Sequence, residues 1–184
     1  MGNIIKIESI SGNKVLFANG VIIGLSFDKI SEYNLRKREE LTQKEYFELI
    51  EIAALSTSYY LLAKRDYSRK ELYQKLLLKY KQDSILKKII SILEEKGYLD
   101  DYEFAKNYVN THRGGRVKLQ YNLRLKGVPS SIVEEVLDSN GQKETEDLQK
   151  EWEKLGDRDK NKKIASLMRK GYQYEDIKKI INKD

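Results

Sequence analysis

The sequence predicts a mainly α protein, in which three tandem three-helix repeats form an elongated body behind a small N-terminal β-meander. Three observations predict this fold class. A signal that starts helices recurs along the chain, one apolar pattern occurs three times, and residues 1–27 are instead rich in β-branched residues separated by turn signals. Repeats with a period of about 45 residues are typical of helical arrays, in which each unit covers an apolar face of its neighbour.

The meander is predicted from three short β-branched or aromatic runs. The runs, in order, are IIKIES, KVLFA and VIIGLSF, with Ser11-Gly12-Asn13 and Asn19-Gly20 between them. Asn-Gly between two such runs is a strong hairpin signal, because both residues adopt positive φ readily. We therefore expect three antiparallel strands, followed over residues 26–41 by a short helix and then a turn.

Helix starts are marked by capping boxes, in which an N-cap side chain and a Glu three residues later each bind the other's backbone amide. The boxes are Thr42 to Glu45, Ser68 to Glu71 and Asp100 to Glu103. The first box predicts a helix that runs to Lys64, with a break near residues 56–58 as an alternative. Gly97, shortly before the third box, supplies the left-handed end of the preceding helix.

One apolar pattern occurs three times without an internal gap, over residues 72–90, 119–137 and 163–181. Each copy indicates two helices joined by a tight turn, with a further helical segment in front of it. The third copy is the poorest, because Lys163 stands where the other copies have leucine. The aligned apolar positions are Leu76 with Leu123 and Leu167, Leu86 with Val133 and Ile177, Ile89 with Val136 and Ile180, and Ile90 with Leu137 and Ile181.

These patterns predict four segments. They are an N-terminal meander and linker at residues 1–41, followed by helical repeats at residues 42–99, 100–140 and 141–184. The polar run DSNGQKETED at residues 138–147 predicts a solvated loop before the third repeat, with a hinge as an alternative.

Composition excludes several classes of protein. The chain has 184 residues, of which 40% are apolar and 35% charged, with no cysteine and a net charge of +6. A disordered chain would hold fewer apolar residues, a bilayer span needs about 18 consecutive ones, and disulfides or thiolate metal sites need cysteine. The start MGNIIKIE lacks the basic and apolar regions of a signal peptide. We therefore expect a cytoplasmic protein that is not associated with membranes.

No constellation of residues indicates catalysis, a cofactor or a metal. His112 is the single histidine, and without a cysteine or a second histidine it makes no metal site. Its place before Arg113 favours a role at a helix end or on the surface. The Gly114-Gly115 pair lacks the preceding strand that a phosphate-binding loop needs. We predict that the protein is not an enzyme and has no cofactor.

Basic residues in repeated positions are the candidate binding residues. Lys79, Lys126 and Lys170 occupy the last turn of the same helix in each copy, where a cation stabilises a helix by about 0.3–1 kcal/mol. In one interpretation, this stabilisation is the whole role of the three lysines. In the other interpretation, the stacked repeats align these lysines with neighbouring cations into a basic track that binds an extended acidic partner. The candidate residues are Lys64, Arg65, Arg69, Lys70, Lys79, Arg113, Arg116, Lys118, Arg124, Lys126, Arg169 and Lys170, with Lys162 and Lys163 beside them in the third copy.

Three stretches of the chain resemble the RecX family of recombination regulators. They are RDYSRKELYQKLL, ILEEKGYLDDYEFAKNYV and RGGRVKLQYNLRLKGV, and the likeness covers residues 55–184. The order and spacing of the motifs S-R-x-E-L, G-Y-L-D-D-x-x-F-A and L-x-x-K-G carry the resemblance. One departure is Gly115-Arg116, where members of the family often have Gly-Pro.

The resemblance implies a curved body of three three-helix repeats that acts as a non-enzymatic regulator and binds RecA protein, chiefly the RecA filament on single-stranded DNA, within its helical groove. We also expect the protein to be a monomer. In that groove it would limit filament growth and reduce ATP hydrolysis, strand exchange and co-protease activity, with weak direct DNA binding as a further property. The alternative is a general nucleic-acid-binding helical repeat protein that acts without RecA. In that alternative, exposed tyrosines such as Tyr73 and Tyr121 stack on bases.

Overall fold

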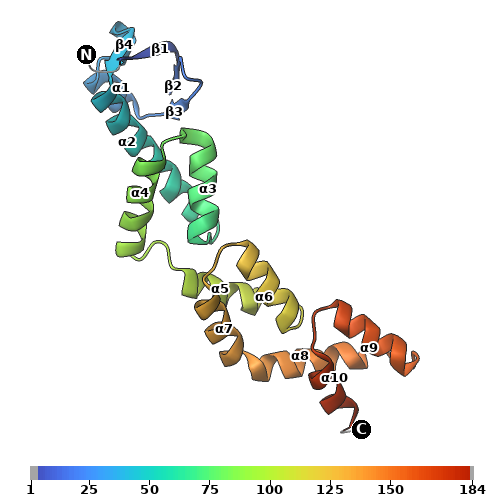
Figure 1. Cartoon of the computed structure of the whole chain (residues 1–184). Helices are drawn as coiled ribbons and strands as arrows, with labels where there is room; N and C mark the ends of the chain where they lie inside the picture. The colour runs from blue at the N-terminus through green and yellow to red at the C-terminus, as the bar shows by residue number, and fades with distance from the viewer. Residues whose placement is uncertain (1–3, 183–184) are drawn as a thin grey trace. The chain divides into compact units, whose positions relative to one another are not determined.

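The computed structural model describes residues 4–182, which form ten α-helices, one short 3₁₀-helix and four β-strands. Figure 1 shows the strands at the N-terminal end of the chain and the helices following them. The chain divides after Leu99 into two compact units, residues 1–99 and residues 100–184. The predicted mainly α fold class is confirmed. No helix in the described range is long and apolar enough to span a lipid bilayer.

The N-terminal strands form an antiparallel sheet in the order β3-β2-β1-β4. The strands are β1 (Ile4–Ser11), β2 (Lys14–Phe17), β3 (Ile22–Gly24) and β4 (Glu40–Thr42). The turn at Asn19-Gly20 joins β2 to β3 as predicted, with Gly20 at a φ of 76°. A fourth strand, which the sequence pattern does not indicate, pairs with β1 so that Leu41 lies opposite Ile5. A strand of three residues is too short for its alternation to be recognised.

A short helix and a turn link the sheet to the first long helix, as predicted. α1 (Phe27–Glu32) is followed by η1 (Leu35–Lys37). The sheet then packs against α2 (Gln43–Leu62), where the rings of Phe17 and Tyr46 meet edge to face with their centroids 4.9 Å apart. The sheet shares one apolar core with the first helices, which gives so small a sheet the packing partner that it needs.

Three long helices lie in the first compact unit: α2, α3 (Arg69–Tyr80) and α4 (Asp83–Glu95). The predicted capping boxes at the starts of α2 and α3 are both formed. α2 continues through residues 56–58 without a break. The hydroxyl of Ser58 donates a 2.7 Å hydrogen bond to the carbonyl of Ala54 one turn earlier, so this buried polar residue fits within the helix.

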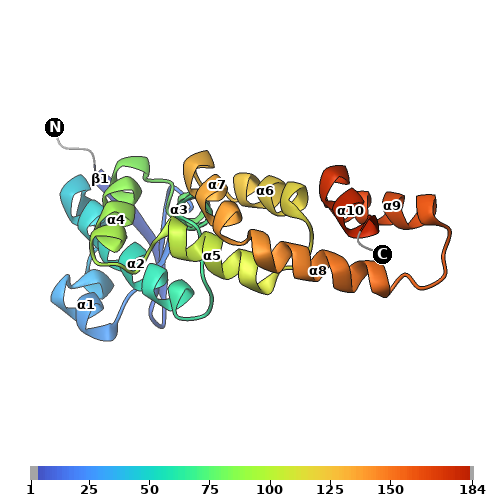
Figure 2. The same ribbon diagram turned by 90° about the horizontal axis from the view of Figure 1, so that it is seen from below.

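Six helices make up the second compact unit (Figure 2). They are α5 (Asp101–Thr111), α6 (Arg116–Leu125), α7 (Ser130–Ser139), α8 (Gly141–Glu153), α9 (Lys160–Arg169) and α10 (Tyr174–Ile181). Asp100 caps α5 as predicted, accepting hydrogen bonds from the amides of Tyr102 and Glu103. The Glu103 carboxylate, however, accepts a hydrogen bond from Lys106 one turn later, so the other half of the predicted box is replaced.

The polar run at residues 138–147 is helical, so the predicted loop is wrong. α7 ends at Ser139 and α8 begins at Gly141, with Asn140 between them, and Figure 2 shows α8 following α7 directly. Gln, Lys and Glu, which are frequent in this run, are good helix formers, and Leu148 anchors the helix in a core. High polarity indicates exposure to solvent, but it does not exclude a helix.

The three copies of the apolar pattern bury their equivalent positions. The fully buried equivalents are Leu76, Leu123 and Leu167 in the first helix of each copy, and Leu86, Val133 and Ile177 in the second. The copies contribute to three separate apolar clusters. Each copy therefore supplies residues to a core of its own.

Lys163 lies in the core of the third copy, at the position that the aligned copies fill with Leu72 and Leu119. The residue is only 9% exposed. Its Nζ donates a 2.9 Å hydrogen bond to the carbonyl of Gly156 and lies 3.9 Å from the centroid of the Trp152 ring. The aliphatic stem of a lysine can fill apolar space while the ammonium group finds partners elsewhere. The third copy therefore keeps the packing pattern of the other two.

Candidate partner-binding surface

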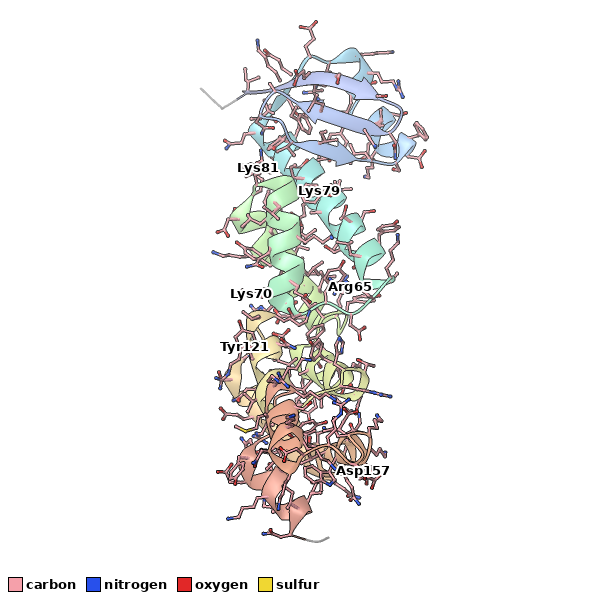
Figure 3. The ribbon with its side chains drawn as sticks, turned by 90° about the vertical axis from the view of Figure 1, so that its right-hand side faces the viewer. Arg65, Lys70, Lys79, Lys81, Tyr121 and Asp157 are labelled. Atoms are coloured by element: carbon pink, nitrogen blue, oxygen red, sulfur yellow. The ribbon has the colours of Figure 1, made fainter. Side chains whose placement is uncertain are left out.

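The predicted cations of the first unit lie near the two ends of α3. Lys64 and Arg65 precede the helix, Arg69 and Lys70 lie in its first turn, and Lys79 lies in its last turn. Figure 3 labels Arg65 and Lys70 near one end of α3 and Lys79 at the other. All five residues are exposed.

Two of these cations stack on aromatic rings. The Nζ of Lys64 lies 4.2 Å from the centroid of the Tyr60 ring, and the guanidinium of Arg65 lies 3.6 Å from that of Tyr67. A cation over a ring face is attracted by the π electrons. Arg65 also lies 3.7 Å from the carboxylate of Glu71. The two charges are therefore held in defined positions at the start of α3.

The cations in the first turn of α3 lie where the helix dipole favours negative charge. Arg69 offsets its unfavourable interaction with the dipole by an ion pair, in which its Nη1 lies 3.2 Å from the Glu94 carboxylate on α4. Lys70 is exposed, and the part of the chain that the structure describes shows no ion pair for it. Helix stability therefore does not explain a lysine at position 70.

The three aligned lysines each contact the first helix of their own repeat. The pairs are Lys79 with the Thr57 hydroxyl on α2, Lys126 with the Tyr108 ring on α5, and Lys170 with the Glu151 carboxylate on α8. These contacts support a structural role for the repeated position. A continuous basic track along all three repeats stays a prediction.

Two cations of α6 are paired with carboxylates of the next helix. The Nη2 of Arg116 lies 2.6 Å from Asp138, and the Nη2 of Arg124 lies 3.5 Å from Glu134. The backbone amide of Arg116 also donates a 2.5 Å hydrogen bond to the Glu144 carboxylate on α8. A proline at this position could not make that bond, because it has no amide hydrogen.

The structure thus separates the predicted binding residues into two groups. Most of them contact a carboxylate, a hydroxyl or an aromatic ring of their own repeat. Four are exposed and, within residues 4–182, show no ion pair. These four are Lys70, Arg113, Lys118 and Arg169.

Two cations outside the predicted set line shallow surface depressions. Lys75 lines one of them together with Lys79, and Arg158 lines another together with Lys162 and Arg169. The spacing of four residues between Lys75 and Lys79 places both on one face of α3, which is a signal that the sequence contains. Arg158 lies in the loop before α9, where no periodic pattern points to it.

Glycine-rich turns bring the second and third repeats into backbone contact. The amide of Gly115 donates a 3.0 Å hydrogen bond to the carbonyl of Lys170, and the amide of Val117 donates one of 3.1 Å to that of Gly171. Gly171 has a φ of 89°, which favours glycine. A methyl group on Gly115 would overlap the backbone of Gly171 and Tyr172. Both sides of the contact therefore need glycine.

A network of charged side chains lies beside this contact. Hydrogen bonds from Lys154 and Lys170 lower the pKa of Glu151 to about 2. Burial, reinforced by nearby carboxylates, raises the pKa of Tyr172 to about 12. Burial also raises the pKa of Glu144, against the opposing hydrogen bond from the first amide of α6. Glu151 is therefore ionised at neutral pH and ties the end of α9 to α8.

Glu151→Gln is expected to lower the stability of the protein at pH 7 by about 1–2 kcal/mol, since it removes a charged partner of two lysines. The pKa of Glu151 is lower in the folded chain than its ordinary value of 4.5, so its contribution is present above about pH 4.5 and is lost as the pH falls toward 2. The melting temperatures of wild type and variant should therefore converge as the pH falls from 5 toward 2.

Glu153→Gln is the matched control, because Glu153 is an exposed residue of the same helix. It should leave the melting temperature nearly unchanged at every pH. A difference between wild type and Glu151→Gln that stays constant across this pH range would contradict the prediction.

His112 ends α5, as predicted. Its ring stacks on that of Tyr108 with the centroids 3.7 Å apart, and its Nδ1 lies 3.0 Å from the Tyr108 carbonyl oxygen. Both contacts are with the last turn of the helix. Among residues 4–182, no group of three or more potential metal-ligating side chains lies together.

Comparison with known proteins shows likeness along the whole chain. The family profile described as "RecX, second three-helix domain" matches residues 100–137. A protein named "Regulatory protein RecX" from Clostridium tetani is 30% identical, over 100% of this chain and 94% of its own length. A protein of the same name from Bacillus licheniformis is 30% identical over 83% of this chain and 65% of its own length.

Solved structures show the same fold. The crystal structure of RecX from Lactobacillus salivarius superposes with a TM-score of 0.66 at 26% identity, covering 73% of this chain and 96% of that one. A second structure, described as a regulatory protein RecX, has a TM-score of 0.64 at 18% identity and covers 99% of this chain and 100% of that one.

Proposed function

The chain belongs to the RecX family of regulatory proteins, and from that premise we propose that it binds RecA and the RecA filament on single-stranded DNA. There it limits filament growth and lowers the rates of ATP hydrolysis and strand exchange. RecX family regulatory proteins are non-enzymatic, so regulation proceeds by binding alone. The observation that carries the proposal is the likeness to a RecX protein over the full chain. We further propose that it acts as a monomer in the cytoplasm.

We propose that the binding body consists of three repeats at residues 42–99, 100–140 and 141–184, behind an N-terminal segment at residues 1–41. The separate apolar clusters of α5 to α7 and of α8 to α10 support this division. A modular body of this kind suits a repetitive partner such as a filament, because equivalent surfaces can meet equivalent sites.

The exposed cations Lys70, Arg113, Lys118 and Arg169 are the members of the predicted set that we propose contact the filament. Their exposure supports this role, since a charge already paired within its own repeat has less to offer a partner. Of the remaining predicted cations, Lys79, Lys126 and Lys170 are proposed to stabilise the packing of their own repeats.

The proposal predicts that the rate of RecA-catalysed ATP hydrolysis on single-stranded DNA falls severalfold as this protein is added. The physical reason is that a protein seated on the filament hinders both the addition of RecA subunits and the turnover of ATP. The rate is measured in a coupled assay across protein-to-RecA ratios below and up to one. A rate that stays unchanged over this whole range would rule the proposal out.

A variant with Lys70→Gln, Lys118→Gln and Arg169→Gln should inhibit more weakly in the same assay, because it removes proposed filament contacts. The matched control replaces the exposed lysines Lys14, Lys44 and Lys160 with Gln, which changes the net charge equally. If both variants inhibit equally weakly, the net charge and not the position of the cations determines inhibition.

General nucleic-acid binding without RecA is the second candidate function, and exposed Tyr121 on α6 favours it. Tyr73, the other tyrosine predicted to stack on bases, is half-buried, and its hydroxyl bonds to Asp83. Binding through phosphates weakens steeply with salt, because contacts release counterions. If filament binding persists at a salt concentration that abolishes binding to naked DNA, the second candidate fails as the main function.

A further inference from the structure

The middle repeat carries an exposed apolar stripe on α6. Val117 is 50% exposed, Tyr121 is 63% exposed and Leu125 is 61% exposed. Residues four apart lie on the same face of a helix, so the three side chains form one continuous row along α6. Tyr121 is labelled in Figure 3. The opposite face of α6 supplies Leu119 and Leu123 to the core, so the stripe plays no part in that core.

The fold itself does not require this stripe, as the other two repeats show. All three repeats bury the same apolar pattern, but at the positions of the stripe they have different residues. The equivalents are Lys70, Gln74 and Leu78 in the first repeat, and Asn161, Ala165 and Arg169 in the third. Only Leu78 is a large apolar side chain like those of the stripe, and it too is exposed. A large apolar side chain at all three positions is therefore a property of the middle repeat alone.

Cations flank the stripe on both sides. Lys118 lies three residues before Tyr121 and seven before Leu125, and Arg124 lies three after Tyr121 and seven after Val117, so the helix places one cation along each edge. α6 contains no acidic residue. Lys118 is exposed, and Arg124 is half exposed beside Glu134. An apolar row between two cationic edges is complementary to an apolar row between two acidic edges.

We propose that the α6 stripe is the docking surface for an acidic amphipathic helix of the protein partner. The partner helix lays apolar side chains along Val117, Tyr121 and Leu125, and Asp or Glu residues at its edges face Lys118 and Arg124. A second copy of this chain does not fit, because its own α6 would bring cations against cations. A single nucleic-acid strand stacks its bases on aromatic rings, which accounts for Tyr121 but not for Val117 and Leu125. The inference rests on the proposed function in that RecA is the partner tested.

The test compares the full chain with a variant carrying Val117→Gln, Tyr121→Gln and Leu125→Gln. Binding to RecA filaments on single-stranded DNA is measured by the fluorescence anisotropy of the labelled protein, and binding to naked single-stranded DNA is measured in parallel. The variant should bind filaments at least about tenfold more weakly, because apolar anchors dominate such interfaces. Its melting temperature should stay within a few degrees of wild type, since exposed substitutions alter stability little.

Leu78→Gln is the matched control, since Leu78 is 83% exposed and occupies the position in α3 that Leu125 occupies in α6. It should bind filaments like wild type. The inference is overturned if the stripe variant binds filaments as tightly as wild type, or if it loses affinity for naked DNA in the same proportion. It is also overturned if wild type forms dimers in sedimentation experiments that the variant does not form.

The failure of this inference is distinguishable from the failure of the proposed function. When wild type binds filaments and the stripe variant binds them equally, only the docking surface is wrong. When wild type binds no filaments at all, the proposed function is wrong and this inference falls with it.

Discussion

Gly115→Ala is expected to lower the free energy of unfolding of the second compact unit by about 3 kcal/mol or more. The added methyl group would overlap the backbone of Gly171 and Tyr172. Backbone atoms cannot move aside as the end of a flexible side chain can, so the turn before α6 must separate from the end of α9. The hydrogen bonds from the amides of Gly115 and Val117 would be lost with this contact.

Chemical denaturation of the full-length protein measures the loss of stability, and hydrogen exchange at the Val117 amide reports directly on the contact. The Val117 amide should exchange much faster in the variant, because its acceptor on Gly171 has moved away. Gly141→Ala is the control in the same unit. A methyl group there meets nothing within 4 Å, and alanine is the better helix former, so stability should stay the same or rise by up to about 1 kcal/mol. A loss below about 1 kcal/mol for Gly115→Ala would mean that the turn adapts at little cost.

Lys163→Glu is expected to destabilise the third repeat by about 3 kcal/mol or more, whereas Lys163→Leu should cost about 1 kcal/mol or less. A glutamate would bring a negative charge against the carbonyl oxygen of Gly156 and the electron-rich face of Trp152, where lysine now donates a hydrogen bond and lies over the ring. Leucine would restore the residue that the first two repeats have at this position. Because Gly156 is exposed, water can replace the hydrogen bond that is lost.

Thermal unfolding, with the fluorescence of the single tryptophan, Trp152, as the local signal, checks this pair of substitutions. Lys162→Glu is the control, because Lys162 is the exposed neighbour of Lys163 on the same helix and should change stability little. A Lys163→Leu variant as unstable as Lys163→Glu would show that the ammonium group, and not the packing of the stem, holds the third repeat together.

Local signals predicted much of the fold. The Asn19-Gly20 turn, the capping residues at Thr42, Ser68 and Asp100, and the helix that begins at residue 43 all depend on contacts between residues a few positions apart. Such contacts are determined by the identity of neighbouring residues, so the sequence contains their signal. The repeated apolar pattern succeeded for a related reason, because helical spacing alone decides which side chains share a face.

Two of the failures involve residues that take their role from distant neighbours. β4 is a strand because Leu41 lies opposite Ile5, and nothing near residue 41 indicates that pairing. Lys163 can lie in the core because its ammonium group donates a hydrogen bond to the Gly156 carbonyl and lies over the Trp152 ring. From the sequence, this lysine suggested that the third repeat is poorly packed, since lysine is almost never buried without a partner.

For the candidate binding residues too, the sequence shows the local features but not the contacts with distant residues. Their charge and repeated spacing are visible in the sequence, but whether a cation faces a partner or a carboxylate of its own repeat is not. Arg116, for example, is visible in the sequence only as a cation near a predicted helix start. Its amide instead bonds to Glu144 and its side chain to Asp138, so much of its role lies within the fold.

The sequence alone shows that the chain is a set of helical repeats behind a small sheet, where α2, α3 and α5 start, and which positions are apolar. Tertiary structure alone decided which cations remain exposed, that Gly115 and Gly171 meet, and that an apolar row on α6 is left uncovered. The two groups of features differ in how far apart along the chain the interacting residues lie. Capping, turns and helical faces arise from interactions within a few residues, whereas ion pairing, backbone contact and exposure depend on which distant segments the fold brings together.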